Sequence, residues 1–291
     1  MNSGLKKFLT GLLTVGKVIL AILIIVIAQL LAELILIPFG EPEGIMYGIA
    51  AGLWGILYPA IAILLVWLFA KFICKKKMSE MLMPKVSVKI KWVAMAFILP
   101  LAVTFFYVLF VPGETVVHTL DGAGKFNAIV IAVIYTGFAA GVVEEMVFRG
   151  LIMDLLKERW NMAVAVIAPS VVFGFVHVLG MNYGLFDILL VTVAGTMVGI
   201  MFSLVALEGG SVWNSAVMHM VWNTIIIGGI FVIGLEKNPN YIAEYLVASD
   251  RFWITGGEFG IEAALPAAIG YTVFALIALM LLKKKNAKKA A

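Results

Sequence analysis

The chain has 291 residues, of which 63% are hydrophobic and 13% are charged, and its formal net charge at pH 7 is +4. Soluble domains have an apolar share of about 45–50%, so this composition excludes a soluble globular protein. The single cysteine, Cys74, excludes an internal disulfide. The modest excess of lysine and arginine has an explanation in membrane topology, and it gives no reason to expect nucleic acid as a partner.

Eight stretches are apolar enough to be membrane-spanning helices, each of which needs about 20 mainly apolar residues. We predict spans over residues 15–38, 47–73, 92–112, 127–156, 162–180, 185–207, 212–235 and 263–282. The predicted fold is therefore all-α, a polytopic membrane helical bundle of about eight transmembrane helices. The longest segment between spans, 236–261, is expected to be an external loop with a short interfacial helix around 242–247.

The lysines predict the orientation of the chain in the membrane. They gather before the first span, between the second and third spans and after the last, at Lys6, Lys7, Lys75, Lys76, Lys77, Lys85, Lys89, Lys91, Lys283, Lys284, Lys285, Lys288 and Lys289. By the positive-inside rule both termini are expected to be cytoplasmic, which an even number of spans also requires. We expect an integral, multi-pass protein surrounded by the lipid bilayer, in the cytoplasmic membrane if the cell is prokaryotic.

Three charged residues lie within six positions of the fourth predicted span: Glu144, Glu145 and Arg149. Each ionised group at bilayer depth costs roughly 2.5–3.5 kcal/mol on insertion scales, so the three need partners or a chemical role. Glu145 and Arg149 are four residues apart and are predicted to form an ion pair on one helix face. Glu144 points about 100° away from Glu145, beside the small residues Ala140 and Gly141, and is free for chemistry. A purely structural packing network of all three charges is the alternative.

Two of the three histidines, His177 and His219, lie inside predicted spans. A lone histidine in an apolar helix is often a packing residue. His219, however, belongs to a polar stripe whose members are four residues apart, Ser211, Ser215, His219 and Asn223. Such a stripe must face the bundle interior or a wet cavity. Glu144, His177 and His219 also fall at similar predicted depths, so we expect them to converge.

One carboxylate, two histidines and an asparagine in one place can hydrolyse a peptide bond. Glu144 can take a proton from water, a histidine can orient that water or protonate the leaving amine, and His219 with Asn223 can stabilise the oxyanion. Glu144, His177 and His219 are also a possible zinc ligand set with an open position for water, as in a metalloprotease. The chain lacks the His-Glu-x-x-His spacing of single-helix zinc motifs, so chemistry without a cofactor is favoured and zinc remains the alternative.

Three short motifs resemble the CPBP family of intramembrane proteases, which includes the type II CAAX prenyl endopeptidases and the bacterial Abi proteins. The family pattern is Glu-Glu-x-x-x-Arg, then Phe-x-x-x-His, then His-x-x-x-Asn or Asp, each on its own helix. In this chain the pattern is filled by Glu144-Glu145-Met146-Val147-Phe148-Arg149, Phe173-Gly174-Phe175-Val176-His177 and His219-Met220-Val221-Trp222-Asn223. The resemblance covers roughly residues 127–230 and includes Gly210-Ser211-Val212-Trp213, which is similar to the usual start of the third helix.

The resemblance implies a bundle of about eight helices with a catalytic cavity open toward the cytoplasm. It implies that Glu144 activates water together with His177, that His219 and Asn223 stabilise the oxyanion, and that Glu145, Arg149 and Phe173 support them. The implied activity is that of an intramembrane endopeptidase. Its substrate would be a membrane-associated protein or peptide, either a CAAX-type prenylated protein or another membrane peptide. The family has been described both as metalloproteases and as glutamate-dependent enzymes, so zinc stays open.

We divide the chain into three parts: residues 1–126 with three transmembrane helices and a basic cytoplasmic loop, residues 127–235 as a CPBP-like catalytic core of four transmembrane helices, and residues 236–291 with the external loop, the last transmembrane helix and a basic cytoplasmic tail. Two other functions are the alternatives. A non-catalytic membrane immunity or regulatory protein of the same fold would be expected to lose Glu144 or a histidine. A transporter would usually show an internal repeat, and the sequence shows none.

Overall fold

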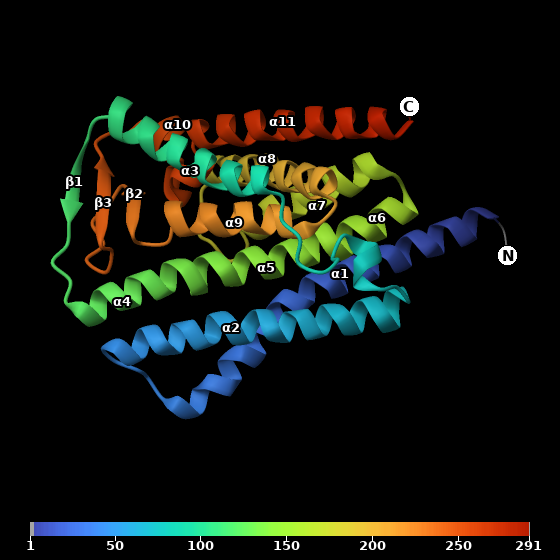
Figure 1. Cartoon of the computed structure of the whole chain (residues 1–291), viewed down its shortest axis with the longest axis horizontal. Helices are drawn as coiled ribbons and strands as arrows, with labels where there is room; N and C mark the ends of the chain where they lie inside the picture. Colours follow the sequence, from blue (N-terminus) through green and yellow to red (C-terminus); the bar gives the residue numbers. More distant parts are fainter. Residues whose placement is uncertain (1–2, 291) are drawn as a thin grey trace.

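The computed structural model describes residues 3–290, and over this range the chain is mainly helical (Figure 1). Within it, 6 helices are long and apolar enough to cross a membrane, so the protein is an integral, multi-pass membrane protein. These spans are Gly4–Leu36, Ile45–Cys74, Ile90–Phe110, Gly122–Arg159, Leu185–Gly209 and Leu265–Ala290. The other two predicted spans are helical but short. They form α7 (Met162–Val176) and α9 (Val212–Ile226), each of 15 residues.

Five of the spans are single long helices, and short helical turns lie between the spans. The long ones are α1 (Ser3–Leu36), α2 (Ile45–Leu68) with its π-helical continuation η2 (Phe69–Cys74), α3 (Ile90–Phe110), α8 (Leu185–Gly209) and α11 (Leu265–Ala290). The short ones are η1 (Ile37–Phe39), η3 (Met78–Met81), α10 (Phe252–Thr255), η6 (Gly257–Phe259) and η7 (Ile261–Ala263).

The fourth span is a single long helical rod with two π-helical stretches. It consists of α4 (Gly122–Val130), η4 (Ile131–Ala139), α5 (Ala140–Glu145), η5 (Met146–Ile152) and α6 (Met153–Arg159). The side chain of Asp121 caps its start by accepting a hydrogen bond from the Gly124 N–H at 2.7 Å, which satisfies one of the unpaired donors of a first helical turn. π-Helical turns inside α-helices often mark functional sites. Here they flank the segment that carries the two glutamates.

A small sheet closes one end of the bundle and corrects two predictions. Its strands are β1 (Gly113–Val117), β2 (Phe231–Gly234) and β3 (Ala243–Val247), with β3 in the centre, antiparallel to β1 and parallel to β2. The predicted span 212–235 is therefore wrong beyond Ile226, and the predicted interfacial helix at 242–247 is a strand. Aromatic and β-branched residues at Phe231-Val232-Ile233 favour a strand once the chain has turned at Gly229, whose φ is 91°.

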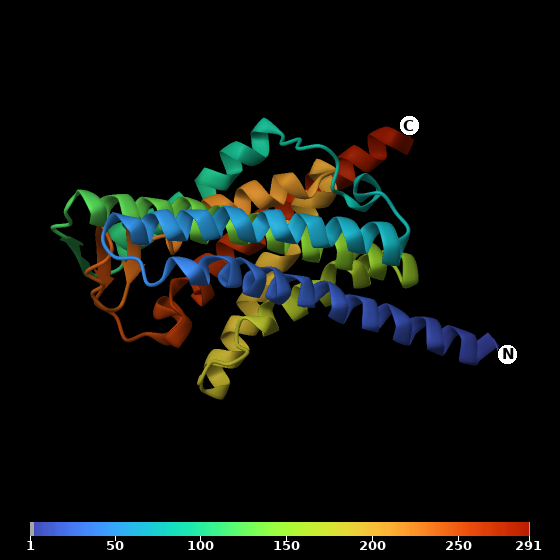
Figure 2. The same ribbon diagram turned by 90° about the horizontal axis from the view of Figure 1, so that it is seen from below.

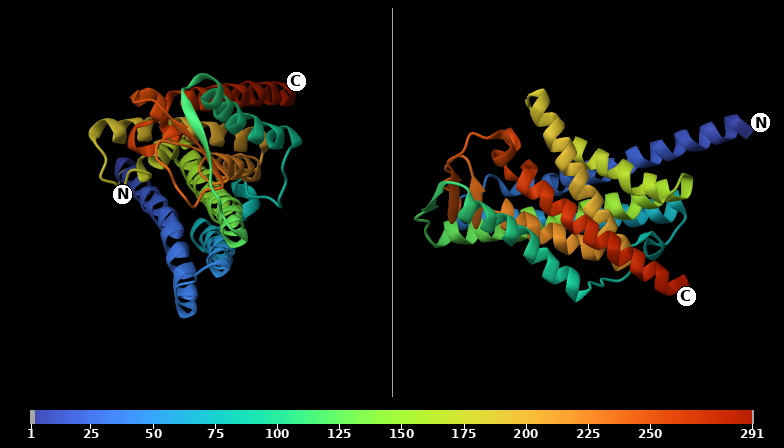
Figure 3. Two further views of the ribbon diagram at one scale, coloured as in Figure 1. Left: turned by 90° about the vertical axis from the view of Figure 1, so that its left-hand side faces the viewer. Right: turned by 90° about the horizontal axis from the view of Figure 1, so that it is seen from above.

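Helix α9 is the central helix of the molecule, and α3, α5, η4 and α8 pack around it (Figure 1). Both ends of the described chain lie at one end of the bundle, and the sheet lies at the other (Figures 1 and 3). The turn between α7 and α8 extends sideways out of the bundle (Figure 2). Its apolar side chains are exposed, including Leu179, Met181, Leu185 and Phe186, which suits contact with lipid.

Candidate active site

The ion pair predicted between Glu145 and Arg149 is present and completely enclosed. Arg149 Nη1 donates to Glu145 Oε1 at 2.8 Å, and the two residues are 2% and 0% exposed. Arg149 Nη2 also donates to the backbone carbonyl of Gly199 on α8, at 3.1 Å. A buried charge without a partner is costly, so the ion pair keeps Arg149 in place, and its bond to Gly199 connects the rod to α8.

Three aromatic rings surround the guanidinium of Arg149. Its central carbon lies 4.6 Å from the ring centroid of Phe173, 5.3 Å from that of Phe202 and 5.8 Å from that of Phe148. A cation close to aromatic rings is attracted by their quadrupoles, and the attraction is stronger where water is absent. Phe173 therefore links the glutamate rod to α7, four residues before His177.

Helix α9 approaches the rod through glycines on the Glu144 side. A Cβ atom at Gly141 would lie 2.5 Å from Met220 Cγ and 2.9 Å from the Met220 backbone nitrogen, and one at Gly137 would lie 2.3 Å from Thr224 Oγ1. Only glycine allows such an approach. It places the polar stripe of α9 beside Glu144, and the stripe is buried as predicted, with Ser211, Ser215, His219 and Asn223 no more than 7% exposed.

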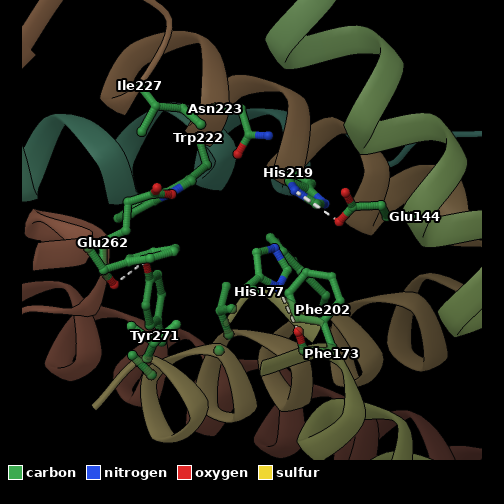
Figure 4. Close-up of a pocket in the computed structure, with 15 residues that line it drawn as sticks. Glu144, Phe173, His177, Phe202, His219, Trp222, Asn223, Ile227, Glu262 and Tyr271 are labelled. Carbon is green, nitrogen blue, oxygen red and sulfur yellow. Dashed lines mark hydrogen bonds and ion pairs between the residues drawn. The ribbon is translucent and has the colours of Figure 1, made fainter. Parts of the chain in front are cut away.

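The convergence expected from the sequence occurs at a cavity of about 220 Å³ (Figure 4). Three elements bring the motif residues to its wall: Glu144 comes from α5, Phe173 from α7 with His177 directly after its last residue, and His219 and Asn223 from α9. Glu145 and Arg149 do not line the cavity. They lie behind it, in the position of supporting residues.

Glu144 faces the cavity with an unsatisfied oxygen. Its Oε2 is buried and has no hydrogen-bond partner among the described residues. The ring nitrogen Nε2 of His219 lies 3.9 Å from this oxygen. Buried carboxylate oxygens are normally hydrogen-bonded, and exceptions need an explanation. A water molecule or a substrate group in the cavity would supply the missing partner.

Both histidines have their Nδ1 atom held by an oxygen acceptor of the protein. His177 Nδ1 lies 2.6 Å from the carbonyl oxygen of Phe173, and His219 Nδ1 lies 3.3 Å from Glu145 Oε1. A carbonyl only accepts, and the Glu145 carboxylate is paired with Arg149, so each Nδ1 carries the proton. The Nε2 atoms are therefore left for the chemistry. The ring of His219 also stacks on Phe202, with centroids 4.9 Å apart, which holds its plane.

Asn223 is anchored to the glutamate rod by one of its two amide N–H groups. Its Nδ2 donates to the carbonyl of Thr136 in η4, at 3.1 Å. The neighbouring Thr224 hydroxyl bonds to the same π-helical stretch at the carbonyl of Ala132, 3.3 Å away. One N–H of Asn223 and its Oδ1 remain available at the cavity wall.

The zinc alternative finds no support in this arrangement. Between residues 3 and 290 no group of three or more His, Cys, Asp or Glu side chains is disposed to hold a metal ion. Glu144, His177 and His219 line one cavity without forming such a group among the described residues, and metal dependence stays a prediction that chelation and metal analysis test.

The sequence analysis missed Glu262. It lies in η7, beyond the motif region, and lines the same cavity together with Trp222, Phe259 and Tyr271 (Figure 4). Trp222 Nε1 donates to Glu262 Oε1 at 2.9 Å, and the Tyr271 hydroxyl donates to the Glu262 backbone carbonyl at 3.1 Å. The sequence contains one weak signal for its role: Glu262 is a carboxylate directly before the last predicted span, 263–282. Such a residue more often marks a helix start.

Comparison with known proteins gives two matches. A family model described as "Type II CAAX prenyl endopeptidase Rce1-like" matches residues 126–225, which contain all three motifs. The curated protein "Putative membrane peptidase YdiL" of Bacillus subtilis (strain 168) is 24% identical over 253 residues, which are 83% of this chain and 97% of that protein. No solved structure matches the chain significantly.

Proposed function

Because the three motifs, the family match and the relative together support a membrane protease of the CPBP family, we propose that this protein is an intramembrane endopeptidase. It would hydrolyse a peptide bond of a membrane-associated substrate, a CAAX-type prenylated protein or another membrane peptide. One observation carries the proposal: Glu144, His177, His219 and Asn223 share a cavity in which Glu144 Oε2 is buried without a partner.

In this proposal a water molecule occupies the space in front of Glu144. His177 Nε2 accepts a hydrogen bond from that water and orients it, because its Nδ1–H is committed to Phe173. Glu144 takes a proton as the water oxygen attacks the carbonyl carbon of the substrate. The peptide C–N bond then breaks, and Glu144 returns the proton to the leaving amine nitrogen.

The oxyanion formed by that attack needs hydrogen-bond donors on the opposite side of the carbonyl. The free N–H of Asn223 is one donor, and Nε2 of His219 is the other. His219 already donates through Nδ1 to Glu145. It can therefore donate through Nε2 only when the ring carries both protons. Glu145 would thus support catalysis as well as folding, since its carboxylate faces this ring.

The direct test is a comparison of membrane proteomes from cells that contain the wild type or Glu144→Gln. The amide keeps the shape of the carboxylate and removes the base. Peptide ends that depend on the wild type would identify the substrate and the bond. A purified cleavage assay on that substrate should then show loss of activity in Glu144→Gln, with an unchanged melting temperature.

Activity near the wild-type level in Glu144→Gln would contradict the role of Glu144 as base. Identical peptide ends in both strains, with both proteins fully folded, would contradict the protease itself. That result would favour the alternative function, a non-catalytic membrane immunity or regulatory protein of the same fold.

A further inference from the structure

Glu262 brings a second carboxylate to the cavity from a part of the chain outside the matched family region, which ends at residue 225. Figure 4 shows it on the wall opposite Glu144, with the histidines and Asn223 between them. The proposed hydrolysis makes no use of it. A substrate that fills the cavity with its peptide bond at Glu144 would also reach the wall that carries Glu262.

The chain holds Glu262 in place through a loop of glycines. Gly256, Gly257 and Gly260 all have positive φ, at 78°, 65° and 94°, and L side chains rarely adopt such values. The Glu258 N–H donates to Asp187 Oδ1 on α8 at 3.0 Å. This bond holds the loop against the helix that contributes Val191 and Phe202 to the cavity wall. Phe259 from the same loop lies against His177, with ring centroids 6.4 Å apart.

Among the described residues no lysine or arginine pairs with the Glu262 carboxylate. The only hydrogen bond to its carboxylate among the described residues comes from the neutral indole of Trp222. The fifteen residues that line the cavity include two glutamates and two histidines and no lysine or arginine. Burial raises the pKa of the Glu262 carboxyl, and the Trp222 hydrogen bond and the nearby rings of His177 and His219 oppose that rise. An ionised carboxylate that is partly enclosed and paired with no lysine or arginine is costly, and a cation entering the cavity would supply the opposite charge.

A purely structural role would be to anchor Trp222 and Tyr271, whose rings meet edge to face at 5.0 Å. The bond from Tyr271 goes to the backbone carbonyl of Glu262, which any residue provides. The bond from Trp222 needs only an acceptor oxygen, which glutamine also provides. Anchoring therefore does not require a negative charge at position 262, and Glu262→Gln separates the two roles.

We infer that Glu262 is a specificity residue that selects substrates with a lysine or arginine side chain beside the scissile bond. This inference rests on the proposed protease function. A carboxylate at the far wall of a substrate pocket acts in this way because it compensates the buried charge of a basic side chain and leaves neutral analogues unpaired. By the same reasoning a free C-terminal carboxylate would be repelled. The inference therefore favours an internal basic site in a membrane peptide over recognition of a CAAX terminus.

The test uses the full-length protein in detergent micelles and a lipid-anchored peptide library with one randomised six-residue stretch, whose products are sequenced by mass spectrometry. Wild type, Glu262→Gln and the matched control Glu258→Gln are compared. Glu258 is an exposed carboxylate of the same loop whose side chain does not line the cavity. We expect lysine or arginine at one fixed position next to the cut for the wild type and the control. In Glu262→Gln the preference for a basic residue should fall about tenfold or more.

Cleavage without a basic preference in the wild type, or a preference that survives in Glu262→Gln, would overturn the inference and leave the protease function standing. If the wild type cleaves no more than Glu144→Gln, the protease function is contradicted. Peptide binding then tests whether Glu262 selects basic side chains. Two fixed peptides that differ only in lysine versus norleucine are then compared by the shift they cause in the melting temperature. A lysine-selective shift that disappears in Glu262→Gln supports the inference, and equal shifts in the wild type overturn it.

Discussion

Nδ1 of His219 lies 3.3 Å from Oε1 of Glu145, the same oxygen that accepts a hydrogen bond from Arg149 at 2.8 Å. One buried carboxylate oxygen thus joins the structural ion pair of the rod to a cavity-lining histidine of α9. The sequence indicated the pair with Arg149 and gave no sign of the contact with His219. Folding and the proposed catalysis therefore depend on the same oxygen atom. Different variants are needed to measure the effect of Glu145 on stability and its effect on activity.

Arg149→Ala should damage folding more than any other single change in the site. It leaves the Glu145 carboxylate buried without its cation, a loss of about 3–5 kcal/mol for a buried pair. It also removes the bond to Gly199 and the contacts with three aromatic rings. The melting temperature in detergent measures this loss. Lys157→Ala, an exposed cation on the same rod, is the control and should change stability by no more than about 0.5 kcal/mol.

The double variant Glu145→Gln with Arg149→Gln should recover part of that stability, because two neutral amides replace two buried charges. It should not recover activity, since His219 loses the charged acceptor at its Nδ1. Equal stability of Arg149→Ala and the wild type would mean that the pair does not form in the bilayer. Full activity in the double variant would contradict the proposed catalytic role of Glu145.

Asn223→Ala should lower kcat by about 10²–10³, the usual cost of one oxyanion donor. Thr224→Val is the matched control. Its hydroxyl bonds to the same π-helical stretch of the rod, at the carbonyl of Ala132, and its side chain does not line the cavity. Both variants lose a bond between α9 and η4, so a loss of kcat confined to Asn223→Ala isolates the chemical role. Equal losses in both would assign Asn223 to helix packing.

Gly141→Ala should separate the rod from α9. The added methyl group would lie 2.9 Å from the backbone nitrogen of Met220 and 3.1 Å from the carbonyl of Ala216, so α9 has to shift. Overpacking of this kind costs typically about 1–3 kcal/mol, and activity should fall because α9 carries His219. In Gly16→Ala, the control, the new methyl group meets nothing within 4 Å. That change in α1 should be neutral or stabilising. Unchanged activity in Gly141→Ala would show that the site tolerates a wider helix spacing.

Activity should survive thorough chelation. The two histidines come from separate helices, each has its Nδ1 occupied by an acceptor, and a mechanism with Glu144 as base needs no metal to activate water. Metal analysis of the active, purified protein checks the prediction. Stoichiometric zinc, together with activity that is lost on its removal and regained on its return, would recast Glu144, His177 and His219 as ligands.

The sequence by itself determined what depends on local periodicity and polarity. Apolar length predicted where the helices lie, because a span has to satisfy its backbone groups internally, although the predicted span 212–235 is too long at its end. Spacing of four residues predicted the Glu145–Arg149 pair and the buried stripe that ends at Asn223, because such residues share a helix face. The three motifs carried the resemblance to the CPBP family for the same reason, since each motif lies within one or two turns.

Only the tertiary structure decided what depends on contacts between distant segments. The sheet takes β1, β2 and β3 from the three parts into which the sequence was divided, so no local pattern could predict its pairing. The tautomers of His177 and His219 follow from acceptors placed by packing, and the Glu145 contact crosses from α5 to α9. Glu262 reaches the cavity 40 residues after Trp222, through a glycine loop whose path is set by Asp187 on another helix. Sequence spacing carries no information about such approaches, because they arise from how the helices pack.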